Sequence, residues 1–177
     1  ACSIVYLFLM YYYTDVAGVP AAFVGTLFLV VRMIDAVSDP VMGMIVDNTR
    51  SRFGKFRPWI VLGTVINSLA LLALFSAHLF SGLQLLLFVT VTYIVWGLTY
   101  TIMDIPFWSM VPALSARREE RERLVVWPRL FASIAWTIVG TCGLASIAFL
   151  GKGDEGKGFL LLSGLIISAF LASALIT

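Results

Sequence analysis

Three ionisable side chains interrupt the apolar stretch at residues 21–46. Arg32, Asp35 and Asp39 are three and four residues apart, so on a helix they project within an arc of about 60°. One arginine neutralises one aspartate, and the remaining negative charge would suit a cation or a proton. The alternative interpretation is a structural ion pair, in which Arg32 neutralises the aspartate one turn along the helix.

A proline beside this group is a possible source of a further ligand. Pro40 follows Asp39 directly and cannot donate a hydrogen bond to the carbonyl of Ala36, four residues earlier. That carbonyl, the two carboxylates and the Ser38 hydroxyl are oxygen ligands of the kind that hard cations prefer, so we expect a site for an ion such as Na+. The same proline is also typical of an ordinary kink in a transmembrane helix.

A second carboxylate, Asp104, precedes Pro106 in the apolar stretch at residues 83–111. Counting by helical turns places polar and aromatic side chains on its face: Tyr93, Gly97, Tyr100, Thr101, Asp104 and Trp108. A carboxylate accepts paired hydrogen bonds from sugar hydroxyls, and aromatic rings cover the apolar side of a sugar, so this face suggests carbohydrate recognition. For Tyr93 and Trp96, the alternative is an interfacial role at the membrane surface.

Arg129 follows Pro128 at the start of a later apolar stretch. Its guanidinium would donate a bidentate pair of hydrogen bonds to sugar hydroxyls or to Asp104. The alternative is an interfacial arginine whose charged end extends to the membrane surface.

Composition identifies the solvent around these groups. Of the 177 residues, 60% are hydrophobic and only 12% are charged, whereas soluble domains carry roughly 25% charged residues. This excludes a disordered chain and a water-soluble domain, so we expect a lipid bilayer to surround the protein. The net charge is +2, with the basic residues in short clusters, which argues against a nucleic-acid partner. The two cysteines form no CxxC pair and predict neither a metal centre nor a resident cofactor.

Six apolar stretches predict an all-α membrane protein, with one six-helix bundle formed by residues 1–177. A helix needs about 20 apolar residues to cross a bilayer. The predicted helices are 1–14, 21–46, 58–79, 83–111, 128–150 and 158–177. The first is short and the chain begins inside it, so we expect this sequence to be cut from a longer protein.

Basic residues concentrate in two of the predicted connections. These are loops 47–57 and 112–127, which together hold eight arginines and lysines, whereas the opposite loops hold Lys152 and Lys157. Short loops rich in Lys and Arg remain in the cytoplasm, so both loops and the N-terminus are predicted to be cytoplasmic. Within residues 117–123, the Arg118–Glu122 and Glu119–Arg123 spacings predict a short surface helix.

Four runs of sequence resemble the glycoside, pentoside and hexuronide cation symporters of the major facilitator superfamily, the family of the melibiose carrier. They are MYYYTDV at 10–16, DAVSDP at 35–40, RSRFGKFRPW at 50–59 and TIMDIPFWS at 101–109. The resemblance implies twelve helices in two bundles, with this chain as the N-terminal bundle and a C-terminal six-helix bundle as its missing partner. It also implies a multi-pass protein of the bacterial inner membrane that is not an enzyme.

The implied activity is symport of a melibiose-like galactoside with Na+, Li+ or H+. By resemblance, Asp35 and Asp39 bind the coupling cation together with Thr101, and would be the ligands of Na+ or Li+. The residues implied to contact the sugar are Asp104, Trp108, Tyr100 and Arg129. Ser38 stands where the family pattern has Asn, which leaves the choice between Na+ and H+ open. The alternative function is a non-transporting half-carrier with a structural or regulatory role.

The predicted orientation is testable by cysteine labelling of the full-length protein in intact cells. A cysteine at Ser51 should resist impermeant thiol reagents, whereas one at Gly153 should react, because basic residues keep the Ser51 loop in the cytoplasm. Permeabilising the cells should expose Ser51→Cys and serves as the control. Labelling of Ser51→Cys from outside the intact cell would contradict the orientation.

Overall fold

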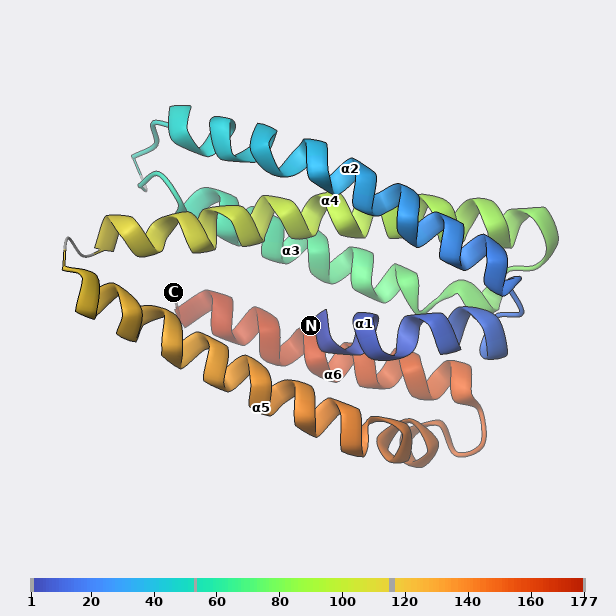
Figure 1. The fold of residues 1–177 in the computed structure, drawn as a ribbon. Coiled ribbons are helices and arrows are strands. Elements are labelled where there is room, and N and C mark those ends of the chain that lie inside the picture. Colours follow the sequence, from blue (N-terminus) through green and yellow to red (C-terminus); the bar gives the residue numbers. More distant parts are fainter. Residues whose placement is uncertain (1, 53, 115–116, 177) are drawn as a thin grey trace.

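The chain folds into helices that run along one another (Figure 1). The computed structural model describes residues 2–52, 54–114 and 117–176, and within them no side chain of 112, 113, 118, 119, 121 and 173–176. The elements are α1 (Cys2–Tyr11), the π-helical turn η1 (Tyr12–Val16), α2 (Ala21–Asn48), α3 (Arg57–Leu74), the 3-10 turn η2 (Ala77–Leu79), α4 (Gly82–Leu114), α5 (Arg118–Gly151) and α6 (Glu155–Ile176).

The predicted all-α six-helix bundle is confirmed. Helices α2 to α6 are each long and apolar enough to cross a membrane. Helix α1 is shorter, and η1 continues its helical path as far as Val16. In Figure 1, α2, α3 and α4 form one group of helices and α1, α5 and α6 form the other, with α3 packed against α6.

The predicted ends of the first and third helices differ from the structure, and Tyr12 accounts for the earlier end of the third. The first helix was expected to end at 14 and the third at 79, but η1 ends at Val16 and α3 ends at Leu74. The Tyr12 hydroxyl donates a 2.6 Å hydrogen bond to the carbonyl of Phe75 and accepts one from the His78 backbone N–H. Because this hydroxyl bonds to backbone groups just past the end of α3, the chain turns there without leaving those groups unpaired.

The predicted loop at 112–127 is wrong. Helix α4 continues to Leu114 and α5 already begins at Arg118, so the connection shrinks to residues 115–117. Residues 118–127 contain neither Gly nor Pro, and the helix formed by these charged residues continues through Pro128 into the membrane span. The segment at 117–123 is therefore the start of α5 and not a separate surface helix.

Charged residues in the predicted loops pair locally. Arg117 lies 3.8 Å from Glu120, while the predicted pairs of Arg118 and Glu119 lie outside the described side chains. In the loop after α2, Lys55 Nζ is 2.8 Å from Asp47 Oδ1. At the opposite end, Lys157 lowers the pKa of Asp154 through a hydrogen bond and its charge. These exposed pairs contribute little to stability.

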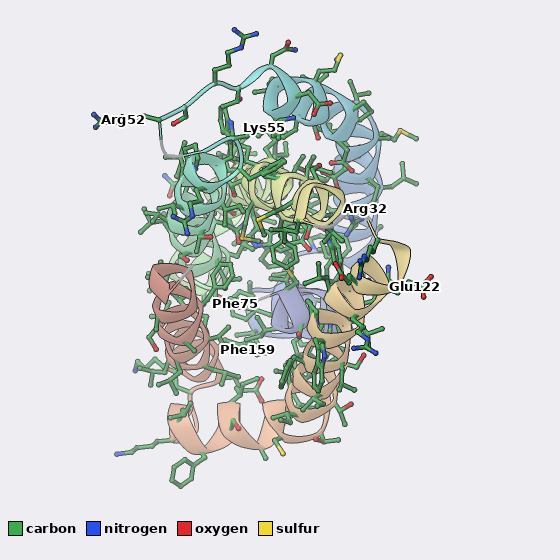
Figure 2. All side chains as sticks on the ribbon, turned by 90° about the vertical axis from the view of Figure 1, so that its left-hand side faces the viewer. Arg32, Arg52, Lys55, Phe75, Glu122 and Phe159 are labelled. Carbon is green, nitrogen blue, oxygen red and sulfur yellow. The ribbon has the colours of Figure 1, made fainter. Side chains whose placement is uncertain are left out.

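An aromatic cluster joins the two groups of helices. Tyr12, Phe75 and Phe159 are fully buried, and their ring centres lie 5.0–5.4 Å apart. Figure 2 shows Phe75 and Phe159 in the interior of the bundle. Such ring pairs add to the stabilisation from burial alone, so this cluster fixes α1, α3 and α6 at one end of the bundle.

Helices α2 and α5, which carry Arg32 and Arg129, bury less of their spans than α3 and α4. Helices α3 and α4 each bury 39% of their spanning window, whereas α2 buries 17% and α5 buries 11%. Gly63 on α3 permits the close packing of α3 on α4, because a Cβ there would lie 2.9 Å from Met103 Cβ. Helix α4 is thus firmly held by α3 and presents a fixed surface to α2.

Candidate functional site

Arg32 contacts two helices at once. Its Nη1 lies 3.2 Å from Asp35 Oδ2 on α2, and its Nη2 donates a 2.8 Å hydrogen bond to the Tyr6 hydroxyl on α1. The guanidinium also lies 5.1 Å from the centre of the Tyr6 ring, within range of a cation–π interaction. The structure therefore contains the ion pair expected from the spacing, and adds a tyrosine that shares the arginine.

Asp39 is paired with a hydroxyl instead of a cation. Thr101 Oγ1 on α4 donates a 2.9 Å hydrogen bond to Asp39 Oδ1 on α2, and Thr101 is only 5% exposed. This bond brings together two residues that the resemblance assigned to the same site. Because a hydroxyl carries no charge, the negative charge of Asp39 is not balanced by this contact.

The remaining predicted oxygen ligands differ in their surroundings. Ser38 Oγ donates a 3.3 Å hydrogen bond to the carbonyl of Asp35, one turn back on its own helix. Helix α2 continues through Pro40 to Asn48. In contrast, Asp35 Oδ1 is buried and has no hydrogen-bond partner among the residues that the structure describes. The α2–α4 contact therefore holds one unpaired carboxylate oxygen.

The second predicted group lies along α4 and meets α5. The Tyr100 hydroxyl donates a 3.0 Å hydrogen bond to Asp104 Oδ1, one turn further along. The Arg129 guanidinium from α5 lies 5.8 Å from the centre of the Trp108 ring. The Tyr100 hydroxyl thus positions Asp104. Arg129 lies beside the ring of Trp108, a residue that is 36% exposed.

The single polar face predicted on α4 divides into two rows. Gly97 and Thr101 face α2, where they lie near Asp35 and Asp39. Tyr93, Trp96 and Tyr100 stack on one another, with centroid distances of 5.9 and 5.7 Å, and Tyr93 also packs on Phe28 of α2. The reason is geometric, since consecutive helical residues such as Tyr100 and Thr101 point about 100° apart.

Sequence reasoning missed Tyr6 and Trp136. Tyr6 stacks on Trp136 of α5 at 6.1 Å and meets the edge of Trp96 at 6.1 Å, in addition to binding Arg32. These side chains come from different helices, and 26 residues separate Tyr6 from Arg32. Helical spacing relates residues of one helix only, so it carries no signal for such a contact.

Comparison with known proteins settles the family. The model of the MFS/sugar transport protein family matches residues 2–177. The chain belongs to this family. Together with its membrane-crossing helices, this membership makes it a multi-pass membrane protein of the major facilitator superfamily, as the sequence resemblance predicted.

Several proteins named as transporters are similar to most of this chain. YagG of Escherichia coli K12, provisionally named a glycoside/cation symporter, is 37% identical over 163 residues, which cover 90% of this chain and 35% of YagG. The isoprimeverose transporter of Lactiplantibacillus pentosus is 34% identical over 88% of this chain and 32% of its own length. A lactose permease of Lactobacillus helveticus is 35% identical over 85% of this chain and 25% of its own. The chain thus spans about a third of the length of such relatives.

The Thr101–Asp39 bond predicts a specific loss of stability. Thr101→Val keeps the shape but leaves the Asp39 carboxylate without its hydroxyl donor, and we expect a loss of about 1.5–3 kcal/mol. Thr101→Ser retains a hydroxyl and should recover most of that loss. Thr26→Val is the matched control, because Thr26 bonds only to a carbonyl of its own helix. Thermal unfolding of the purified full-length protein measures all three, and equal unfolding temperatures for Thr101→Val and Thr26→Val would contradict the prediction.

Proposed function

We propose that this chain is the N-terminal six-helix bundle of a symporter that couples uptake of a glycoside to a monovalent cation. The observation that carries the proposal is the uneven charge in the middle of membrane-crossing helix α2, where Arg32 pairs with Asp35 and a second aspartate, Asp39, follows one turn later. The family membership supports it, because sugar transport is the activity after which that family is described.

The proposed cation site lies between α2 and α4. An uncompensated carboxylate inside a bilayer costs several kcal/mol, so a chain retains one there when a ligand neutralises it. Among the described residues, Asp35 Oδ1 is unpaired and the Asp39 carboxylate is bonded only to the Thr101 hydroxyl. Oxygens from both helices therefore lie near one unbalanced negative charge. Oxygen ligands of this kind suit Na+ or Li+. Protonation of the same carboxylates would serve H+ coupling. The Ser38 hydroxyl would join the site only by leaving the Asp35 carbonyl.

The proposed sugar site lies further along α4 and reaches α5. Asp104 retains acceptor capacity beyond its bond from Tyr100, and Trp108 offers a partly exposed ring for the apolar side of a sugar. Arg129 beside that ring would donate paired hydrogen bonds to hydroxyls. Relatives named for isoprimeverose and lactose support a glycoside as the substrate class, and a melibiose-like galactoside is the member that we favour.

The two sites are coupled through α4. Thr101 and Asp104 are three residues apart on the same helix, and Thr101 is bonded to the cation group while Asp104 belongs to the sugar group. A cation that draws Asp35 and Asp39 together would fix this part of α4 and with it the position of Asp104. Binding free energies are reciprocal, so the sugar would tighten cation binding by the same factor.

Transport requires a second bundle in this proposal. Carriers with two repeats alternate access by moving one bundle against the other around a central site. Helices α2 and α5 have the most exposed spans and supply Arg32 and Arg129, so they would face that second bundle. We place the carrier in the cytoplasmic membrane of a bacterium with its N-terminus in the cytoplasm, in keeping with the basic loop at 50–57.

Calorimetric titration of the purified full-length carrier tests the assignment of the two sites. Asp104→Asn removes a charge-assisted hydrogen bond to a sugar hydroxyl and should cost about 1.5–3 kcal/mol, or roughly ten- to a hundredfold in sugar affinity. Cation affinity measured without sugar should change much less. Asp35→Asn should weaken the cation first and the sugar only through the lost coupling.

Asp15→Asn is the matched control, since Asp15 lies in η1 and its carboxylate bonds to Thr14, outside both groups. We expect both affinities to remain unchanged in that variant. If Asp104→Asn weakens the cation as strongly as the sugar, a single shared carboxylate cluster replaces the two-site assignment. If neither ligand binds the unmodified carrier, the proposed function is wrong.

A further inference from the structure

The row of α4 that faces α2 contains a residue without a side chain. Gly97 lies one turn before Thr101, and a Cβ built at Gly97 would be 3.0 Å from Val31 Cγ1 and 3.4 Å from Asp35 Oδ1. Arg32 contacts the other oxygen of this carboxylate, Oδ2. Glycine at 97 therefore places no side-chain atom of α4 against the buried and unpaired oxygen of Asp35.

This oxygen matters because it is buried without a hydrogen-bond partner among the described residues. A buried acceptor without a partner loses its hydration and gains nothing in exchange, which costs about 1–3 kcal/mol, and more for a charged group. Asp35 Oδ1 is a buried acceptor of this kind, although the Asp35 side chain as a whole is 18% exposed. A methyl group 3.4 Å away would close the approach to this oxygen by ordinary van der Waals contact, without any hydrogen bond in return.

We propose that Gly97 determines which cation the α2–α4 site accepts, by leaving space for Na+ or a water ligand of Na+ beside Asp35 Oδ1. This inference rests on the proposed symport function. Na+ is larger than Li+ and takes more oxygen ligands, and selectivity between such ions follows from cavity size, ligand number and flexibility. A side chain at 97 would therefore exclude Na+ more strongly than Li+.

The other ligands of the site should survive a change at 97. Asp39 and Thr101 bond to each other one turn away from Gly97, and that bond does not involve Asp35 Oδ1. A methyl group at 97 should thus reduce the number of oxygen ligands at the site without abolishing cation binding. Li+, which needs fewer ligands, is the ion that such a reduced site retains.

The test compares Gly97→Ala with the unmodified full-length carrier. The apparent affinity for each ion is measured from the stimulation of galactoside binding by NaCl or LiCl. We expect the Na+ affinity to fall about tenfold or more and the Li+ affinity to fall less than about threefold. Gly25→Ala on α2 is the matched control, because a Cβ at Gly25 meets nothing within 4 Å, and both affinities should stay unchanged there.

A double variant separates ion selectivity from helix packing. Val31→Ala removes the Cγ1 atom that makes the shorter contact, so Gly97→Ala combined with Val31→Ala retains the methyl group beside Asp35 but relieves the crowding of α2. The Na+ to Li+ affinity ratio should remain shifted in the double variant. This variant also supplies the measurement if Gly97→Ala alone lowers expression.

The outcomes distinguish this inference from the function on which it rests. A ratio that returns to that of the unmodified carrier in the double variant, or Na+ and Li+ affinities that fall equally in both variants, overturns the role of Gly97 alone. An unmodified carrier whose sugar binding responds to no cation overturns the proposed function and this inference with it.

Discussion

An uncompensated carboxylate of α2 inside the bilayer governs how the polar helices pack. Arg32 contacts Asp35, while Asp39 receives only a hydroxyl from Thr101. The cost of such a charge explains why α2 is held against α4 through polar contacts in a region where lipid tails are the solvent. Helix α4 can serve as the fixed partner because α3 packs closely on it through Gly63.

The charges of α2 also connect α1 and α5 to the proposed cation site. Tyr6 of α1 binds Arg32 and stacks on Trp136 of α5. A shift of the arginine away from Asp35 would therefore disturb α1 directly and α5 through Tyr6. At the far end of the bundle, the buried cluster around Tyr12 and Phe75 keeps α1 and α3 together. The bundle is thus firmly packed at the end that holds Tyr12, while charged and polar side chains contact one another in its interior.

The sequence predicted the helical membrane fold, because long apolar stretches have few alternatives in lipid. It also predicted that Asp35, Asp39 and Thr101 belong together, though only the family resemblance related residues of different helices. Helix boundaries were less predictable: α3 ends where Tyr12, distant in sequence, satisfies the Phe75 carbonyl. The contact between Tyr6 and Arg32 could not be predicted for the same reason, because a contact between two helices leaves no periodic pattern in the sequence of either helix.

In the proposed carrier, the carboxylates of α2 bind the coupling cation directly. Infrared difference spectroscopy of the purified full-length carrier tests it by recording the carboxylate stretching bands before and after addition of Na+ or Li+. We expect a cation-induced change in these bands that disappears in Asp35→Asn and in Asp39→Asn but persists in Asp104→Asn. The same band change in both α2 variants as in the unmodified carrier would contradict the claim.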